Sequence, residues 1–501
     1  MKMTRTQFIA LIAVSIAIAM AWLDMTILSV ALPSIQKSFD ISRNQTQWIM
    51  TIYLLFSAVL AFGAGRLSDL FGHHRAFSLG AALFILSSLF CGLSFNVDIL
   101  IVMRALQAIG GTFAVISGMS YLSTTFPIES RGRANGITTS IASIAPIIAP
   151  FLGGLIIKFL NWHWIFFVNV VIGVCIFIPL IKIFFENENP VQEKKIDYTG
   201  FIAIGIFTVT ITLIFNHIGN WGWTSDKTLS GFLIAFAALL FFIIFELKQS
   251  HPIIDLQLFK LTNYVPGCVV MFLSQFVNFF IIFFGVYIQN ALGYSPFMTG
   301  VLLLPIGILL TAFSSTGGRI ADRYGARIPM NIGFFLITIG YILSTIFISS
   351  LSYLALLPAF IGYGFGACLL GNPLRISMLK NTPTKQFGMS TAILSGIRQI
   401  GGVIGFAVIG TIIAHTETLS VVSGLKKILP TISMRDIKVL QGILSHTPSS
   451  LKLLSQFNLE KQSQIKALVL NSYVHSFHSA LLFSSVVLLI CSVISVLFIK
   501  R

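Results

Sequence analysis

Long apolar runs separated by short polar connections fill most of the chain. A helix needs about 20 apolar residues to cross the hydrocarbon core of a bilayer, and fourteen runs of about this length follow one another. They lie near residues 8–32, 47–65, 76–95, 97–121, 134–157, 163–185, 198–217, 228–246, 264–290, 298–317, 328–349, 352–374, 388–412 and 472–499. The pattern predicts an all-α membrane protein with fourteen transmembrane helices.

The composition excludes soluble classes of protein. Hydrophobic residues make up 56% of the chain and charged residues 10%, whereas soluble domains carry about 25% charged residues. Disordered chains are excluded by the same figures. The five cysteines fall singly in the predicted helices, so neither a disulfide framework nor a metal site is expected. No phosphate-binding Gly-x-x-x-x-Gly-Lys-Ser/Thr loop is present, which argues against transport driven by ATP.

Basic residues set the predicted orientation in the bilayer. With the N-terminus in the cytoplasm, 19 of the 32 lysines and arginines fall in cytoplasmic segments and only four in the short outer loops. Cytoplasmic loops of membrane proteins are enriched in these residues. Both termini are therefore predicted to be cytoplasmic in a multi-pass protein of the cytoplasmic (inner) membrane. The net charge of +16 is thereby explained without a nucleic-acid partner.

One outer loop, about 413–470, is too long for a simple connection. Its segments from Ile432 to Leu444 and from Leu451 to Leu468 are amphipathic. Two interpretations are open: the segments form a pair of helices on the outer membrane surface, or they contact a periplasmic adaptor protein.

A motif of the form Gly-Arg-x-x-Asp-x-aromatic-Gly occurs twice, 253 residues apart, in equivalent cytoplasmic turns. The last six predicted helices therefore repeat the first six, and paired halves of this kind are how transporters alternate access to a site between them. We predict an N-terminal six-helix bundle (1–187), two inserted helices (188–262) and a C-terminal six-helix bundle that includes the long outer loop (263–501). The repeated residues are Gly65, Arg66, Asp69 and Gly72 in the first copy and Gly318, Arg319 and Asp322 in the second.

Several further motifs accompany this repeat. They are Leu23-Asp24-Met25-Thr26 in the first predicted helix, Arg104-Ala105-Leu106-Gln107 in the fourth, Ala149-Pro150-Phe151-Leu152-Gly153-Gly154 in the fifth and Arg398-Gln399-Ile400-Gly401-Gly402 in the thirteenth. Together they resemble the fourteen-span drug:proton antiporters of the major facilitator superfamily, the multidrug-resistance protein B type, over nearly the whole chain. The resemblance implies two pseudo-symmetric bundles and export of small molecules by alternating access, with the proton gradient as the energy source and no cofactor.

Asp24 is the one acidic residue, of 16, that lies inside a predicted helix away from both ends. At about 1.5 Å per residue, Asp24 and Arg104 lie about 13 Å and 10 Å from the outer ends of their helices. An unpaired charge at such depth is strongly unfavourable, so we expect the two to pair. We predict that Asp24 carries the proton and that Arg104 stabilises its charged form; the resemblance implies the same roles. The alternative is a fixed ion pair that only joins two helices.

The resemblance assigns a conformational switch to the repeated loop motif. Asp69 is expected to face the N-terminus of the thirteenth helix near Gly388, where a carboxylate gains roughly 0.3–1 kcal/mol, and so to hold the cytoplasmic side closed. Arg66 and Arg75 either hold Asp69 or acidic lipid heads, or only fix the orientation.

The fifth predicted helix carries the residues of the antiporter motif. Two prolines kink the helix and two glycines allow neighbouring helices to approach closely, an arrangement that limits leakage through the centre. These residues are Pro146, Pro150, Gly153 and Gly154.

Polar and aromatic residues in the helices are candidates for the lining of a substrate cavity. A cavity with aromatic rings and one acid suits lipophilic compounds, monovalent cations among them. Arg398 has no acid at matching depth, so it is satisfied by backbone or water, faces an anionic group, or extends to a helix end. The candidates are Gln47, Trp48, Tyr53, Gln107, Gln275, Asn278, Gln289, Asn290 and Arg398.

Two other functions remain open at this point. One is a proton-coupled symporter of a nutrient or siderophore, against which the proline–glycine motif argues. The other is a polytopic membrane enzyme or a lipid-handling protein, but an enzyme needs clustered catalytic groups and the chain has no cluster of acids and no His-Glu-x-x-His.

Overall fold

The computed structural model describes residues 3–184, 197–249, 256–313, 316–379, 382 and 387–499, and these residues form helices without any strand. The first part of the chain holds α1 (Arg5–Phe39), α2 (Arg43–Phe71), α3 (His73–Gly92), α4 (Val97–Thr125), α5 (Ile128–Phe159), α6 (His163–Phe184), α7 (Tyr198–Trp221) and α8 (Asp226–Glu246). The middle holds η1 (Leu256–Lys260), α9 (Tyr264–Asn278), α10 (Phe280–Asn290), α11 (Pro296–Ala312), α12 (Thr316–Tyr324) and α13 (Arg327–Phe347). The last part holds η2 (Ile348–Ser350), η3 (Tyr353–Ala355), α14 (Leu357–Cys368), α15 (Gly371–Leu379), α16 (Phe387–Ile428), α17 (Met434–Leu440), η5 (Gln441–Ser445), α18 (Pro448–Leu454) and α19 (Leu459–Phe498).

The prediction of an all-α membrane protein is confirmed. Each of the fourteen predicted runs coincides with a helix or with consecutive helices. Among the described residues, eleven helical segments are long and apolar enough to cross a membrane, and two shorter apolar helices accompany them. The run predicted at 264–290 is divided into α9 and α10 at Phe279.

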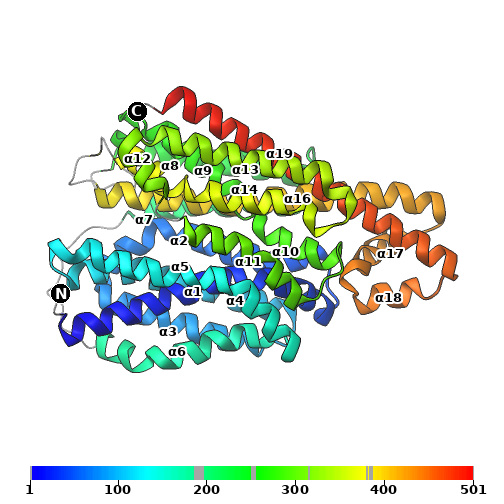
Figure 1. The fold of residues 1–501 in the computed structure, drawn as a ribbon, viewed down its shortest axis with the longest axis horizontal. Coiled ribbons are helices and arrows are strands. Elements are labelled where there is room, and N and C mark those ends of the chain that lie inside the picture. The colour runs from blue at the N-terminus through cyan, green and yellow to red at the C-terminus, as the bar shows by residue number, and fades with distance from the viewer. Residues whose placement is uncertain are drawn as a thin grey trace.

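The helices form one elongated bundle, and the described chain begins and ends at the same end of it (Figure 1). We call this end the termini end and the opposite one the cap end. Helices α1 to α6 pack on one another, and so do α9, α10, α11, α13, α14, α16 and α19. Contacts between the two groups run through α1 and α10, α2 and α16, and α5 and α11. The predicted boundary at 187/188 lies outside the described residues.

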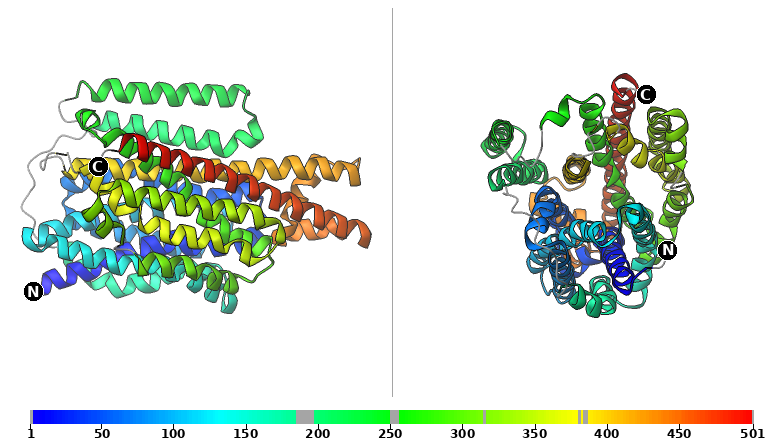
Figure 2. Two further views of the ribbon diagram at one scale, coloured as in Figure 1. Left: turned by 45° about the horizontal axis from the view of Figure 1, so that its top comes forward. Right: turned by 90° about the vertical axis from the view of Figure 1, so that its left-hand side faces the viewer.

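Helices α7 and α8 lie side by side at the periphery of the bundle (Figure 2). Helix α8 packs on α7, which packs in turn on α2 and α16. The inserted pair therefore touches both groups of helices from outside and leaves the centre between them free.

Short polar side chains begin four of the helices that start at the cap end. Ser42, Asn96, Ser225 and Ser295 each accept a hydrogen bond from the backbone N–H three residues later, at the starts of α2, α4, α8 and α11. Such an N-cap contributes about 1 kcal/mol and satisfies a backbone donor that the helix itself leaves open.

The segment predicted as a long outer loop is largely helical. Helices α16, with 42 residues, and α19, with 40 residues, extend beyond the rest of the bundle, and α17, η5 and α18 pack between their ends (Figure 1). We call these ends together with α17, η5 and α18 the cap. The amphipathic pattern seen in the sequence is explained by a separate hydrophobic core, formed by Val421, Leu425, Ile437, Leu440, Ile443, Leu454, Ile465 and Val469.

Candidate functional site

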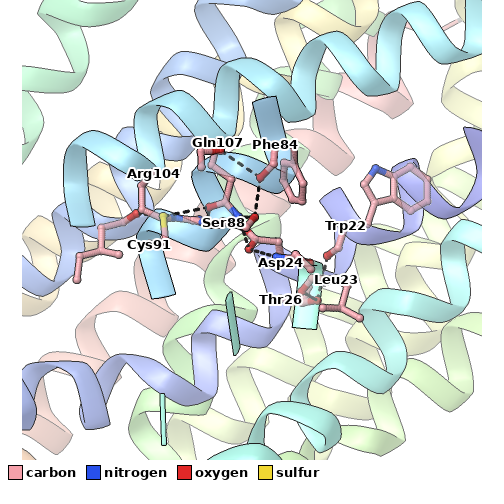
Figure 3. A network of polar contacts seen from close by, with 12 residues as sticks. Trp22, Leu23, Asp24, Thr26, Phe84, Ser88, Cys91, Arg104 and Gln107 are labelled. Carbon is pink, nitrogen blue, oxygen red and sulfur yellow. Dashed lines mark hydrogen bonds and ion pairs between the residues drawn. The ribbon is translucent and has the colours of Figure 1, made fainter. Parts of the chain in front are cut away.

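A buried ion pair joins α1 and α4 in the middle of the first group of helices. Arg104 Nη1 donates to Asp24 Oδ2, and both side chains are almost completely inaccessible, with exposed fractions of 0% and 1%. Figure 3 shows Asp24 facing Arg104 and Gln107 of α4, with Ser88 and Cys91 of α3 beside them. The pairing expected from matching depth is present.

The second carboxylate oxygen of Asp24 is held by two amides. Gln107 Nε2 and Asn169 Nδ2 each donate to Asp24 Oδ1 at 2.9 Å. Gln107 also donates to Ser88 Oγ at 2.7 Å and accepts from Arg104 Nη1 at 2.6 Å. Gln107 was predicted to line a cavity; the structure places it in this network instead. The role of Asn169 escaped the sequence analysis, although an amide in so apolar a helix as α6 was a usable signal.

Aromatic rings enclose the guanidinium of Arg104. Its Cζ lies 4.3 Å from the centroid of the Tyr53 ring and 5.8 Å from that of Phe166, distances at which a cation is attracted to the ring face. Arg104 Nε donates to the carbonyl of Ile49 at 3.4 Å. Among the described residues, Nη2 has no hydrogen-bond partner. The charges are thus compensated by each other and by dipoles, and the site is sealed from solvent.

A cavity of about 540 Å³ lies between the two groups of helices. Helices α1 and α5 line one side, and α9 to α11, α14 and the start of α15 line the other. From α1 the lining residues are Trp22, Met25, Thr26 and Ser29. Trp22 projects away from the ion pair (Figure 3), so α1 turns Asp24 toward α4 and its neighbours toward the cavity.

Two of the residues predicted to line a cavity do so. Asn278 lines the main cavity and, with Gln275, a smaller one of about 120 Å³. Asn278 Oδ1 accepts a hydrogen bond from Tyr363 Oη. Arg398 is exposed and is not among the residues that line either cavity, whereas Tyr363 lines both.

The remaining predicted residues lie elsewhere. Gln47 Nε2 donates to the carbonyl of Phe406 at 3.5 Å, and Trp48 packs against His217 with ring centroids 5.6 Å apart. Tyr53 covers Arg104. The other two are Gln289 and Asn290, at the cap end of α10.

Hydrogen bonds at the cap end connect the two groups of helices. Gln289 Nε2 donates to the carbonyl of Val30 at 3.0 Å. Ser445 of the cap donates to Gln36 Oε1 at 2.8 Å and accepts from Asn290 Nδ2 at 3.1 Å. In this structure the cap end is therefore closed over the cavity.

Asp40 extends the same connection at the end of α1. Its Oδ1 accepts from Ser449 N at 3.2 Å and from Ser449 Oγ at 2.7 Å. Asp40 has a left-handed backbone, with φ of 52°, in which an aspartate is tolerated. The last turn of α1 is thus held by the first turn of α18.

The residues of the antiporter motif form a tight seam between α5 and α11. Pro146 and Pro150 lie inside α5 and line the cavity. A Cβ at Gly154 would lie 2.4 Å from the carbonyl oxygen of Pro296 in α11, and one at Gly153 would lie 2.7 Å from the Ile27 side chain in α1. Only glycine permits this approach of the backbones.

The repeated loop motif lies at the termini end. Gly72, with φ of 87°, separates α2 from α3; Arg75 and Arg319 are exposed, and Gly65 and Gly318 lie in helices. The side chains of Arg66, Asp69 and Asp322, and the surroundings of Gly388, lie outside the described part of the structure. The predicted switch contact of Asp69 stays a prediction.

Comparison with known proteins gives consistent matches. Residues 14–406 match the Major Facilitator Superfamily. Multidrug resistance protein Stp of Mycobacterium tuberculosis (strain CDC 1551 / Oshkosh) is 31% identical over 85% of this chain and 80% of Stp. The tetracenomycin C resistance and export protein of Streptomyces glaucescens is 31% identical over 81% and 75% of the two chains. A bacterial homologue of the human lysosomal transporter Spinster, solved in an inward-facing and occupied conformation, has a similar fold, with a TM-score of 0.65, 14% identity, and 99% and 97% of the chains covered.

Proposed function

The chain belongs to the major facilitator superfamily, and we propose that it exports lipophilic small molecules across the cytoplasmic membrane in exchange for protons. It is a transporter and not an enzyme. The relatives named for multidrug resistance and for tetracenomycin C export support export rather than uptake. The proposed orientation has the termini end in the cytoplasm and the cap outside, in agreement with the distribution of basic residues.

The observation that carries this proposal is the buried carboxylate on α1. Removing one partner of a buried ion pair typically costs 3–5 kcal/mol because the other charge is left uncompensated. Protonation of Asp24 removes its charge in the same way and leaves Arg104 with Gln107 and the neighbouring rings. The proton therefore weakens the attachment of α1 to α4 by an amount large enough to favour another arrangement of the helices.

Helix α1 offers a direct route from the proton site to the rest of the molecule. The same helix carries Asp24, four residues of the cavity lining, and Gln36, which bonds to the cap. A movement of α1 on protonation thus changes the cavity and the cap-end contacts together. Such coupling through one rigid element is what exchange of a proton for a substrate requires.

The cap is proposed to act within the transporter. Its hydrogen bonds to Gln36, Asp40 and Asn290 reach both groups of helices, and its core is its own. These contacts support a role for the cap in closing the outer side of the transporter. This role does not require a periplasmic adaptor protein. Export by the purified protein alone in proteoliposomes tests this assignment.

The test of the function is proton-driven uptake of fluorescent lipophilic dyes into inverted membrane vesicles, where export appears as uptake. We expect wild type to accumulate dye and to release protons from the lumen when dye is added. Asp24→Asn is expected to abolish both signals. The matched control is Asp98→Asn, which neutralises an exposed acid in the first turn of α4 and should keep both.

Equal amounts of each variant in the membrane must be verified by immunoblot. Undiminished proton-driven accumulation by Asp24→Asn would refute the assignment of the proton site. Dye or nutrient movement out of inverted vesicles, coupled to proton exit, would show a symporter instead.

A further inference from the structure

Two hydroxyl groups lie at one level of the main cavity, on either side of the seam between α5 and α11. The two helices run in opposite directions, and a Cβ at Gly307 of α11 would lie 2.4 Å from the Ile147 side chain of α5. One helical turn farther toward the termini end, α5 carries Ser143 and α11 carries Thr311. Both residues line the cavity, and Thr311 is exposed while Ser143 is half-buried. The pair therefore belongs to the cavity wall and not to a packed core.

The hydrogens of these two hydroxyls are already used within their own helices. Ser143 Oγ donates to the carbonyl of Ser140 at 2.9 Å, and Thr311 Oγ1 donates to the carbonyl of Gly307 at 2.9 Å. A hydroxyl has one hydrogen to donate and two lone pairs with which to accept. Within the described part of the chain, neither oxygen accepts a hydrogen bond from the protein. Toward the cavity the pair therefore acts as a hydrogen-bond acceptor.

The walls of the main cavity carry no charge among the described residues. The lining contains no aspartate, glutamate, lysine, arginine or histidine. Asp24, the acid of α1, has an exposed fraction of 1% and is held by Arg104, Gln107 and Asn169. A charged group that leaves water without gaining a partner is strongly unfavourable. The cavity therefore favours ligands without a charge.

We propose that the transported molecules are uncharged and lipophilic and carry a hydrogen-bond donor, which Ser143 and Thr311 accept. This inference rests on the proposed function and specifies the substrate class at the same cavity. A lipophilic cation gains no carboxylate in these walls, whereas a neutral hydroxyl or N–H group replaces its bonds to water by bonds to the two oxygens.

The rest of the cavity suits the apolar body of such a molecule. Phe279, Leu303 and Ile306 belong to its walls, together with Trp22 and Met25 of α1. The volume of about 540 Å³ falls within the roughly 300–1,000 Å³ of sites for drug-sized ligands. A compound of several fused rings with a single donor group therefore fits the size and the chemistry of the cavity.

The experiment compares three probes of nearly the same shape: 1-pyrenemethanol, 1-ethylpyrene and 1-pyrenemethylamine, whose amine is protonated at neutral pH. Binding to the purified full-length protein in a neutral detergent is measured by energy transfer from tryptophan to pyrene, because Trp22 lies in the cavity wall, with correction for partition into empty micelles. Wild type is expected to bind the alcohol at least about tenfold more tightly than the ammonium.

The test variant combines Ser143→Ala with Thr311→Val, which remove the two hydroxyls and keep the shape of the side chains. The preference for the alcohol over 1-ethylpyrene should be about three- to tenfold larger in wild type than in this variant. The control is Ser230→Ala on the peripheral α8, an exposed serine that also donates to the carbonyl three residues before it. This control should keep the wild-type preference.

Three results would overturn the proposal. The first is tighter binding of the ammonium than of the alcohol, which would show a site for cations. The second is an equal preference for the alcohol in wild type and in the double variant. The third is undiminished energy transfer in Trp22→Phe, which would place the probes outside this cavity. Each would leave the export proposal standing, since that is decided by the response of dye transport to Asp24→Asn.

Discussion

Adding one methyl group to the seam between α5 and α11 should open the cap end. In Gly154→Ala the new Cβ would lie 2.4 Å from Pro296 O and 2.6 Å from Phe297 Cα. Restoring an ordinary contact requires the two helices to separate by about 1 Å. Overpacking of this kind costs about 1–3 kcal/mol, and only in the state in which the seam is closed. The cap-open population should therefore rise by roughly 5- to 150-fold.

The population is measured by double electron–electron resonance between nitroxides on cysteines placed at Lys37, near the cap end of α1, and at Tyr294, in the connection between α10 and α11; both positions are exposed. Cys175, the exposed cysteine among the five, is replaced by serine. The long-distance fraction should grow in Gly154→Ala. The control is Gly136→Ala on the same helix, where a Cβ meets nothing within 4 Å. Equal distance distributions in wild type and Gly154→Ala, or an equal shift in the control, would refute the reasoning.

Three further outcomes are expected. Asp40→Ala removes both hydrogen bonds from Ser449 and should raise the long-distance fraction in the same resonance experiment; an unchanged fraction would contradict a latch at the cap. Asn169→Ala takes one donor from Asp24 Oδ1 and should lower the stability of the protein by about 1–3 kcal/mol, seen as a lower midpoint of thermal unfolding in detergent; a midpoint within error of wild type would speak against a tight network. Leu440→Ala in the core of the cap should lower the stability of the cap by about 2–5 kcal/mol and make the cap sensitive to protease. Protease resistance equal to that of wild type would contradict a separate hydrophobic core in the cap.

Apolar composition was sufficient to predict where the helices lie. Breaks within helices were not predictable in the same way. The run at 264–290 remains apolar through Phe279 and Phe280, so hydropathy has no signal for the end of α9 and the start of α10. The continuation of α16 into the long outer segment was not predicted either. Polar side chains lower the hydropathy beyond residue 412, although the helix continues without interruption to Ile428.

The ion pair was predictable because depth along a helix can be counted from the sequence. Cavity lining also depends on how each helix is rotated about its axis, which counting does not give. Gln107 and Tyr53 therefore turned out to surround Asp24 and Arg104. Trp22 lies two residues before Asp24 but was not predicted to line the cavity. The direction in which its side chain points depends on how α1 packs against α4 and α5, and the sequence does not give that packing.

Helix α16 continues without a break from the termini end into the cap. At about 1.5 Å per residue its 42 residues span about 63 Å, roughly twice the hydrocarbon thickness of a bilayer. Such a rod works as a lever, whose far tip sweeps a longer arc than its middle for the same rotation. The cap therefore magnifies small rotations at the bilayer centre. In the proposed orientation the cap lies outside the membrane, so an antibody fragment or nanobody bound to the cap would hold the end of α16 in one position and stop the transport cycle without entering the cavity.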